Sequence, residues 1–348
     1  MWLDGKRVLV TGGTGSFGQV VVNRLLSGEM GQPENITVFS RDEAKQHYMR
    51  LSYINREAAT DEIIYRNFQQ MLRFSIGDMR DYNAVLQAVR HAEVVIHAAA
   101  LKQVPTCEYF PEQAIMTNIG GAQNLVRAIR SHDTPVETVV ALSTDKACGP
   151  INVYGMTKAI MERVIIEGNM DSDTRFVGVR YGNVIASRGS VIPLFLNQIE
   201  NGGPVTITHK DMTRFWLELD HAVDIVFESI RSAKRGEVYV PRVPASRIVD
   251  LAEVLMGGRE VPIVYTGIRP GEKIHEILVS EEESNRTIER NGFYVIQPIL
   301  PELLDEGGEP ATPVLDGAYT SAEVTLDHEA LGTMMAKYVD AYAVEGLK

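Results

Sequence analysis

The sequence predicts an α/β fold with a doubly wound parallel sheet, and two observations lead to that prediction. Short β-rich runs alternate with longer helical runs through the first half of the chain, as in parallel sheets that helices cover on both faces. The first β-rich run leads into a glycine-rich turn and then a helical run, which is how dinucleotide-binding domains of this class begin. With 348 residues, of which 45% are hydrophobic and 23% charged, the chain can bury a full core.

The expected elements follow from these runs. Strands are expected at residues 7–10, 36–39, 73–76, 94–97, 138–143 and 176–180, and helices at residues 17–26, 82–89, 113–131 and 154–167. The interval 40–72 is long for one crossover, so two helical pieces, 42–56 and 61–71, are expected within it. Further along, residues 305–313 are predicted to form a loop and residues 326–342 a closing helix.

Composition and charge exclude several classes of protein. The formal net charge of −12 argues against nucleic-acid binding, but it permits a phosphorylated small substrate at a locally basic site. Cys107 and Cys148 are the only cysteines, so reduced thiols are expected rather than a disulfide framework. No apolar run approaches a membrane span, no signal peptide precedes the first strand, and the histidines lack metal-site spacing. The expectation is a soluble cytoplasmic protein with no metal, membrane or nucleic-acid partner.

The glycine-rich turn after the first strand is the predicted dinucleotide site. Gly12, Gly15 and Gly18 would let the backbone turn sharply, approach a pyrophosphate and pack the helix close to the strand. The start of the following helix supplies N–H donors and the positive end of its dipole. A plain loop is the alternative, and the strand and helix that flank the turn argue against it. The cofactor contacts predicted here are Thr11, Gly12, Gly15, Ser16, Phe17 and Gly18.

The end of the second strand predicts which dinucleotide binds. An NAD site usually carries Asp or Glu there, whereas an Arg accommodates the 2′-phosphate of NADP. Ser40 and Arg41 stand at this point with Lys45 one helical turn on, so NADP is favoured. Asp42 is open to the interpretation that it caps the next helix. The remaining predicted contacts are Asp78 and Met79 after the third strand, and Ala98, Ala99 and Ala100 after the fourth.

The predicted catalytic residues follow the fifth strand. Thr144, Asp145 and Lys146 end that strand, and Tyr154 and Lys158 lie four apart, on one face of the next helix. A lysine beside a tyrosine, with the positive nicotinamide ring nearby, would lower the tyrosine pKa and make it a usable base. Two plainer interpretations stay open, a surface Tyr–Lys pair on an amphipathic helix and an Asp–Lys salt bridge at a strand end.

Two sets of motifs carry a resemblance to known enzymes. Thr-Gly-x-x-Gly-x-x-Gly followed by Tyr-x-x-x-Lys resembles the extended short-chain dehydrogenases/reductases. A narrower resemblance, to the configuration-inverting UDP-N-acetylglucosamine 4,6-dehydratases that open pseudaminic acid biosynthesis, covers about residues 5–300. It rests on Ser143-Thr144-Asp145-Lys146-Ala147-Cys148, Arg180-Tyr181-Gly182-Asn183-Val184, Ser187-Arg188-Gly189-Ser190-Val191, Met212-Thr213-Arg214-Phe215-Trp216 and Arg269-Pro270-Gly271-Glu272-Lys273-Ile274-His275-Glu276. The long 40–72 interval and the tail beyond residue 300 depart from it.

The resemblance implies a mechanism. Tyr154 would take the proton of the sugar 4-OH while hydride leaves C4 for NADP⁺. Lys146 would then remove the C5 proton, Asp145 would protonate the departing 6-OH, and hydride would return to C6. Protonation of C5 from the opposite face would invert it, and retaining relatives carry Glu where Lys146 stands. Burial and adjacent positive charges are expected to lower the pKa of Lys146 so that its amine can be neutral.

The resemblance also implies a substrate side. A dinucleotide-binding Rossmann domain is expected at residues 1–182 plus about 213–241, and a smaller C-terminal α/β substrate-binding domain at about 183–212 plus 242–348. A homo-oligomer is expected, with residues 56–71 near an interface. The predicted substrate contacts are Lys102, Asn183, Arg214, Arg269 and Glu272.

Three other functions stay open. A nucleotide-sugar 4-epimerase or reductase would use Tyr154 and Lys158 without needing Asp145 and Lys146. A retaining 4,6-dehydratase would act on a related nucleotide sugar. A catalytically idle Rossmann protein would bind NADP(H) only as a sensor or scaffold.

Overall fold

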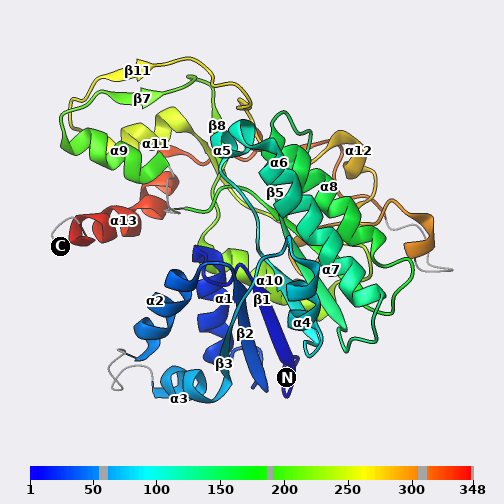
Figure 1. Ribbon diagram of the computed structural model, residues 1–348. Helices are drawn as coiled ribbons and strands as arrows, with labels where there is room; N and C mark the ends of the chain where they lie inside the picture. Colours follow the sequence, from blue (N-terminus) through cyan, green and yellow to red (C-terminus); the bar gives the residue numbers. More distant parts are fainter. Residues whose placement is uncertain (55–61, 186–190, 305–311, 346–348) are drawn as a thin grey trace.

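A large, mostly parallel sheet forms the centre of the computed structural model, which describes residues 1–54, 62–185, 191–304 and 312–345 (Figure 1). Its strand order is β13-β14-β9-β6-β5-β4-β1-β2-β3. The run from β3 to β9 is parallel, and β14 and β13 add an antiparallel edge. The part 3-2-1-4-5-6 is the strand order of dinucleotide-binding sheets, so the predicted α/β, Rossmann-type fold is confirmed. The strands are β1 (Arg7–Thr11), β2 (Asn35–Ser40), β3 (Leu72–Ile76), β4 (Val94–His97), β5 (Thr138–Thr144), β6 (Arg175–Tyr181), β9 (Val238–Pro241), β13 (Thr287–Arg290) and β14 (Phe293–Ile296).

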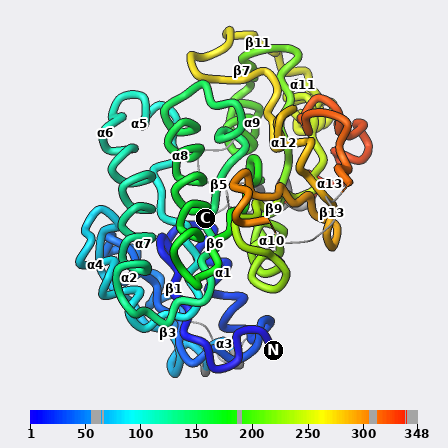
Figure 2. The backbone as a smooth tube through the Cα atoms, turned by 90° about the vertical axis from the view of Figure 1, so that its right-hand side faces the viewer, coloured from blue at the N-terminus to red at the C-terminus, as the bar shows by residue number. Residues whose placement is uncertain are grey.

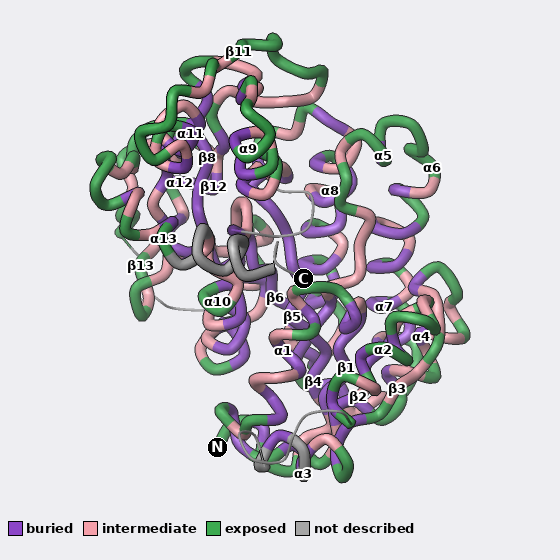
Figure 3. The backbone as a smooth tube through the Cα atoms, turned by 90° about the vertical axis from the view of Figure 1, so that its left-hand side faces the viewer, coloured by how far each residue is buried: buried purple, intermediate pink, exposed green. Residues whose placement is uncertain are grey.

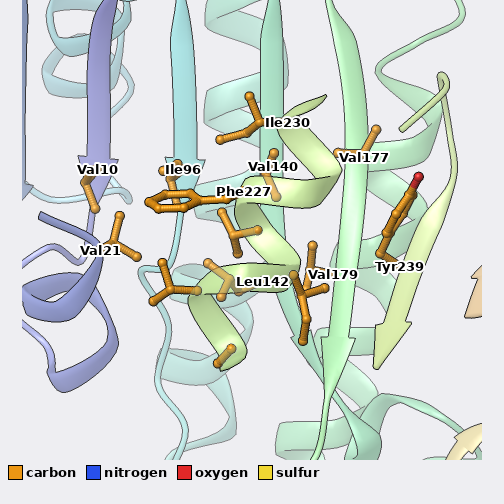
Figure 4. Close-up of a cluster of buried hydrophobic side chains, with 14 of the residues drawn as sticks. Val10, Val21, Ile96, Val140, Leu142, Val177, Val179, Phe227, Ile230 and Tyr239 are labelled. Atoms are coloured by element: carbon orange, nitrogen blue, oxygen red, sulfur yellow. The ribbon is translucent and has the colours of Figure 1, made fainter. Parts of the chain in front are cut away.

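Helices cover both faces of the sheet because successive strand residues point to opposite sides. Val8 and Val10 of β1 join a core with α1 and α10, whereas Leu9 joins a second core with α4, α7 and α8. Figure 4 shows the first core, where Val140 and Phe227 lie between strands and helix. Figure 3 shows β5 and β6 buried between layers whose outer faces are exposed. The helices are α1 (Ser16–Leu26), α2 (Glu43–Ile54), α3 (Glu62–Met71), α4 (Tyr82–Val89), α5 (Val104–Tyr109), α6 (Pro111–Ala114), α7 (Gly121–Arg130), α8 (Val153–Glu167) and α10 (Leu219–Ser232).

The helix expected at residues 113–131 is present, but it contains a π-helical segment. The structure has α6, then a π-helix, η1 (Ile115–Gly120), and then α7. Asn118 in η1 is buried, and its side chain accepts from the N–H of Leu101 at 2.8 Å and donates to the Leu101 carbonyl at 3.0 Å and the Thr157 hydroxyl at 3.0 Å. These three bonds help hold the wider turn, and turns of this kind often occur at functional sites.

The other expected elements differ only in their ends. The extra helix in the long interval is present, as α2 and α3, while residues 55–61 lie outside the described part of the chain. The closing helix is α13 (His328–Glu345). Of the predicted loop at 305–313, residues 305–311 also lie outside the described part. No helix among the described residues is long and apolar enough to cross a membrane.

A third core lies at the end of the molecule opposite α3 (Figures 1 and 2). There Phe195, Leu251 and Leu331 pack together from three helices. Small two-stranded sheets lie outside the central sheet, pairing β7 with β11, β8 with β10 and β12 with β15, and β7 and β11 contribute to this third core. The elements not yet named are α9 (Val191–Glu200), α11 (Ile248–Met256), α12 (Glu281–Ser284), β7 (Val205–Ile207), β8 (Thr213–Phe215), β10 (Ala245–Arg247), β11 (Ile263–Tyr265), β12 (Ile277–Val279) and β15 (Tyr319–Thr320), with 3₁₀ turns η2 (Asp145–Ala147) and η3 (Pro301–Leu303).

Candidate active site

One cavity of about 1290 Å³ joins the ends of the parallel strands to the third core. It opens at the carboxyl ends of β1 and β4, where the strand order reverses and ligands of such sheets bind. All the predicted site residues line it except Thr11 and Asp145, which are 1% and 0% exposed. The cavity therefore brings the glycine-rich turn, the catalytic cluster and the substrate candidates together.

The glycine-rich turn could hold the pyrophosphate of a dinucleotide. Gly12 has φ +68°, and a Cβ there would lie 2.8 Å from the backbone nitrogen of Ala99. A Cβ on Gly18 would lie 2.4 Å from the Cα of Gly13, so only glycine allows α1 to approach the turn. Gly15 is the N-cap, and no side chain in the described part of the chain caps α1. The first N–H groups of this helix thus suit a phosphate.

Thr11 is buried next to the glycine-rich turn and is hydrogen-bonded to the end of β4. Its hydroxyl hydrogen-bonds Nδ1 of His97 at 2.8 Å and accepts from the N–H of Ala99 at 3.4 Å. These bonds hold the end of β4 against the end of β1. The rings of Phe17 and Tyr181, which also line the cavity, stack with centroids 6.2 Å apart.

The end of β2 presents a cation to the cavity. Arg41 is half exposed, with Nη1 3.8 Å from a carboxylate oxygen of Asp78. Asp42 accepts from the N–H of Lys45 at 2.9 Å and forms an ion pair with its ammonium at 3.1 Å, so its carboxylate is engaged at the start of α2. The Ser40 hydroxyl accepts from Nε2 of Gln46 at 3.0 Å and keeps its own proton to donate. Arg41 and Ser40 are therefore placed to hold a phosphate.

Tyr154 and Lys158 face the cavity from α8, but their pKa values differ from the sequence expectation. Burial raises the pKa of Tyr154 to about 12, and the charge of Lys146 and a hydrogen bond with Thr144 only partly oppose it. Lys158 is not among the groups that lower this pKa, and its ammonium donates instead to the carbonyl of Leu142 at 2.5 Å. The lowering by a bound nicotinamide ring stays a prediction. Burial lowers the pKa of Lys158 itself to about 8.

Asp145 and Lys146 form an ion pair at the cavity wall. Nζ of Lys146 lies 3.1 Å from Oδ1 of Asp145, and the Thr144 hydroxyl donates to the same oxygen at 2.8 Å. The other oxygen, Oδ2, is buried with no hydrogen-bond partner in the described part of the protein. The salt bridge that the sequence left open is thus present, and it lies within the site rather than away from it.

The expected lowering of the Lys146 pKa is also wrong. Burial alone would lower it, and the Arg214 charge acts in the same direction, but the carboxylates of Asp145 and Glu276 outweigh both and raise it. Lys146 is therefore an ammonium in this state. Glu276, which the sequence interpretation did not assign to the site, lies 3.5 Å from the lysine nitrogen. Glu276 is the last residue of the motif that begins at Arg269, but nothing in the sequence shows that its side chain points toward Lys146.

The substrate candidates surround the same cluster. Asn183 Oδ1 accepts from the Lys146 ammonium at 3.3 Å, and Nη2 of Arg214 lies 3.5 Å from Glu272. Arg214 also donates to the carbonyls of residues 213, 273 and 274, which fix its guanidinium. Arg269 and Lys102 line the cavity from two other segments. The motif residue Arg188 lies outside the described part of the chain.

Comparison with known proteins places the chain in a family. Residues 8–298 match the family described as "Polysaccharide biosynthesis protein". The chain belongs to that family. A relative from Campylobacter jejuni subsp. jejuni serotype O:23/36 (strain 81-176), named UDP-N-acetylglucosamine 4,6-dehydratase (inverting), is 40% identical over 331 residues, covering 91% of this chain and 93% of the relative. A relative from Rickettsia bellii (strain OSU 85-389), named UDP-glucose 4-epimerase, is 43% identical over 302 residues, covering 85% and 84%.

Solved structures resemble this family member over most of its length. The X-ray structure of Pen from Bacillus thuringiensis has a TM-score of 0.82 at 34% identity, covering 97% of this chain and 100% of that one. The dTDP-glucose 4,6-dehydratase DesIV from Streptomyces venezuelae, solved with NAD and TYD bound, has a TM-score of 0.64 at 20% identity, covering 77% and 86%. At that identity DesIV supports only the fold.

Proposed function

We propose that this chain catalyses NADP-dependent 4,6-dehydration of UDP-N-acetylglucosamine with inversion at C5. The product would be UDP-2-acetamido-2,6-dideoxy-β-L-arabino-hex-4-ulose. The observation that carries the proposal is the Asp145–Lys146 pair, 3.1 Å apart, in which Lys146 lines the same cavity as the glycine-rich turn and Tyr154. An inverting dehydratase among the relatives supports it.

Each side chain has a role in the proposed reaction. The glycine-rich turn with Ser40 and Arg41 would hold NADP, which when bound would supply the hydride-transfer chemistry at C4 and C6. Tyr154 would take the proton of the 4-OH, assisted by the positively charged groups around it. Lys146 would take the C5 proton, which the 4-ketone acidifies, and Asp145 would protonate the departing 6-OH. We further propose that Lys102, Asn183, Arg214, Arg269 and Glu272 hold the nucleotide sugar.

The Asp145–Lys146 pair can reach the protonation state that this chemistry needs. A base at Lys146 must be a neutral amine, and an acid at Asp145 must carry a proton. Moving one proton across the 3.1 Å hydrogen bond from Nζ to Oδ1 produces both at once. In a buried site the neutral form is less penalised than in water, because separated charges are poorly solvated there. We therefore propose that the two side chains act together in the reaction, with the proton passing between them.

A nucleotide-sugar 4-epimerase is the second candidate, and the Rickettsia relative favours it. An epimerase would use Tyr154 and Lys158 and leave the Asp145–Lys146 pair without a chemical step. The mass of the product separates the two functions. We expect incubation with UDP-N-acetylglucosamine to yield a nucleotide sugar lighter by one water, whereas an epimer has the mass of the substrate.

We expect NADP(H) to bind more tightly than NAD(H), because Arg41 and Ser40 can hold the 2′-phosphate. Arg41→Ala should weaken NADP(H) binding by about 1.5–3 kcal/mol, as for a lost charged hydrogen bond, and leave NAD(H) binding nearly unchanged. Isothermal titration calorimetry on cofactor-free protein measures both. Equal affinities in the wild type, or an NAD preference that Arg41→Ala does not alter, would contradict the assignment.

We also propose a homo-oligomer whose interface lies near residues 56–71, and a substrate domain formed by about 183–212 plus 242–348. The support is the resemblance to dehydratases and the insertion that α2 and α3 make in the long interval. Static light scattering at micromolar concentration is expected to give a multiple of the 38.6 kDa chain mass. A monomer would rule the oligomer out.

A further inference from the structure

We propose that Glu276 is a positioning residue for the dehydration step, which holds the Lys146 amine and the Arg214 guanidinium in place on the cavity wall. The inference rests on the proposed function. Glu276 precedes β12 and is only 2% exposed. Its Oε1 lies 3.5 Å from Nζ of Lys146 and 3.6 Å from Nε of Arg214. One carboxylate oxygen thus links two cations that would otherwise repel each other.

The other carboxylate oxygen of Glu276 strengthens the argument. Oε2 is buried and has no hydrogen-bond partner in the described part of the structure. A buried carboxylate is costly unless it is compensated by positive charge. The compensation here comes from Lys146 and Arg214, so the carboxylate is held by the groups that the reaction uses. A residue that served only the fold would not need to face the cavity cluster.

A segment near the C-terminus holds the Glu276 backbone. The N–H of Glu276 donates to the hydroxyl of Ser321 at 2.9 Å, and the carbonyl of Glu276 accepts from the N–H of Ser321 at 2.9 Å. The Ser321 hydroxyl also lies 2.6 Å from that of Thr213, the residue before Arg214. Ser321 therefore hydrogen-bonds both Glu276 and β8, the strand that carries Arg214. The tail beyond residue 300, which departs from the family motifs, supports the site in this way.

The effect of Glu276 on the pKa of Lys146 depends on the other charged and titratable groups around the lysine. Asp145 faces the lysine from the end of β5, Glu276 from the segment before β12, Arg214 from β8 and Tyr154 from α8. The two carboxylates outweigh the guanidinium and the effect of burial, and so raise the pKa of Lys146. Removing the Glu276 charge leaves Arg214 opposing Asp145, so the pair should lose its proton at lower pH.

The test compares Glu276→Gln, which removes the charge, with Glu276→Asp, which keeps it on a shorter side chain. The ¹³Cε shift of Lys146, assigned by its absence in Lys146→Arg, is followed against pH in full-length protein. In Glu276→Gln we expect the titration midpoint to fall by about one unit or more, and in Glu276→Asp to stay closer to wild type. With NADP and UDP-N-acetylglucosamine, kcat of Glu276→Gln should fall about 10²-fold, as for a misplaced reacting group, with a smaller change in KM.

Glu272→Gln is the matched control, because it removes a carboxylate 3.5 Å from the same Arg214. It should alter KM without moving the Lys146 midpoint. An unmoved midpoint in Glu276→Gln, or a kcat within twofold of wild type, would overturn the inference. If neither Glu276 variant folds, Ser321→Ala decides: a lower kcat at similar KM supports the inference, and an unchanged kcat overturns it. An inactive wild type would refute the proposed function alone, since the titration needs no turnover.

Discussion

Replacing Lys146 by alanine should lower the rate of dehydration by about 10²–10⁴, the usual loss when a positioned general base is removed. Lys146 is the group that would take the C5 proton, and the nearest alternatives, the carboxylates of Asp145 and Glu276, are only 0% and 2% exposed. Binding of NADP(H) should be retained, because the glycine-rich turn is a separate part of the cavity wall. Fluorescence titration with NADPH and a product assay measure the two effects.

Lys146→Arg is the control that separates charge from basicity. A guanidinium keeps the positive charge beside Asp145, but it does not deprotonate in proteins and cannot act as the base. We therefore expect the arginine variant to be about as inactive as the alanine variant. Activity restored by arginine would mean that Lys146 contributes only charge. Near wild-type turnover in Lys146→Ala would remove its assigned role altogether.

Replacing Arg180 by alanine should lower the free energy of unfolding by about 3–5 kcal/mol, the cost of leaving buried charges without their partner. Arg180 lies on β6 and is 3% exposed. It pairs with Glu162 of α8 at 2.7 Å and with Glu283 of α12 at 2.7 Å. It thereby fastens the helix that carries Tyr154 to the sheet and to the C-terminal part. Urea denaturation at pH 7 measures the change.

The loss of unfolding free energy in Arg180→Ala should depend on pH. Burial alone would raise the pKa of Glu283, but the hydrogen bonds and charge of Arg180 lower it to about 2. In the wild type, the stability from this carboxylate is present above its ordinary pKa of about 4.3 and is lost as pH falls toward 2. Without Arg180 the Glu283 carboxylate takes up a proton more readily, so the deficit should shrink as pH falls from 7 toward 5.

An exposed ion pair is the control for Arg180. Arg242 lies 3.2 Å from Glu289, and both side chains are about half exposed. Arg242→Ala should cost at most about 1 kcal/mol, as for other surface pairs. A loss in Arg180→Ala as small as that in Arg242→Ala would show that the buried network contributes little.

Local patterns made much of the fold and site predictable. The turn from β1 into α1 depends on glycines whose neighbours leave no room for a Cβ, so it is visible in the sequence itself. Tyr154 and Lys158 share a helix face for the same local reason. The predicted strands matched because buried parallel strands are continuous apolar runs.

Long-range contacts set the properties that the sequence did not predict. The pKa of Lys146 depends on Glu276, which is 130 residues away and reaches the site only through the fold. The π-helix is stabilised by hydrogen bonds between Asn118 and Leu101, which are 17 residues apart, so local helix propensity could not predict it. The pKa of Tyr154 is raised because burial exceeds the influence of neighbouring charges.

The configuration at C5 of the product tests the central claim most directly. Purified protein is incubated with NADP and UDP-N-acetylglucosamine in D₂O, and the product is followed by ¹H NMR. We predict a 4-keto-6-deoxy sugar with solvent deuterium at C5 and ring couplings of the L-arabino configuration, because in the proposed mechanism Lys146 would take the C5 proton and the new one would arrive on the opposite face. A D-xylo product would contradict inversion, and a 4-epimer that has lost no water would contradict dehydration itself.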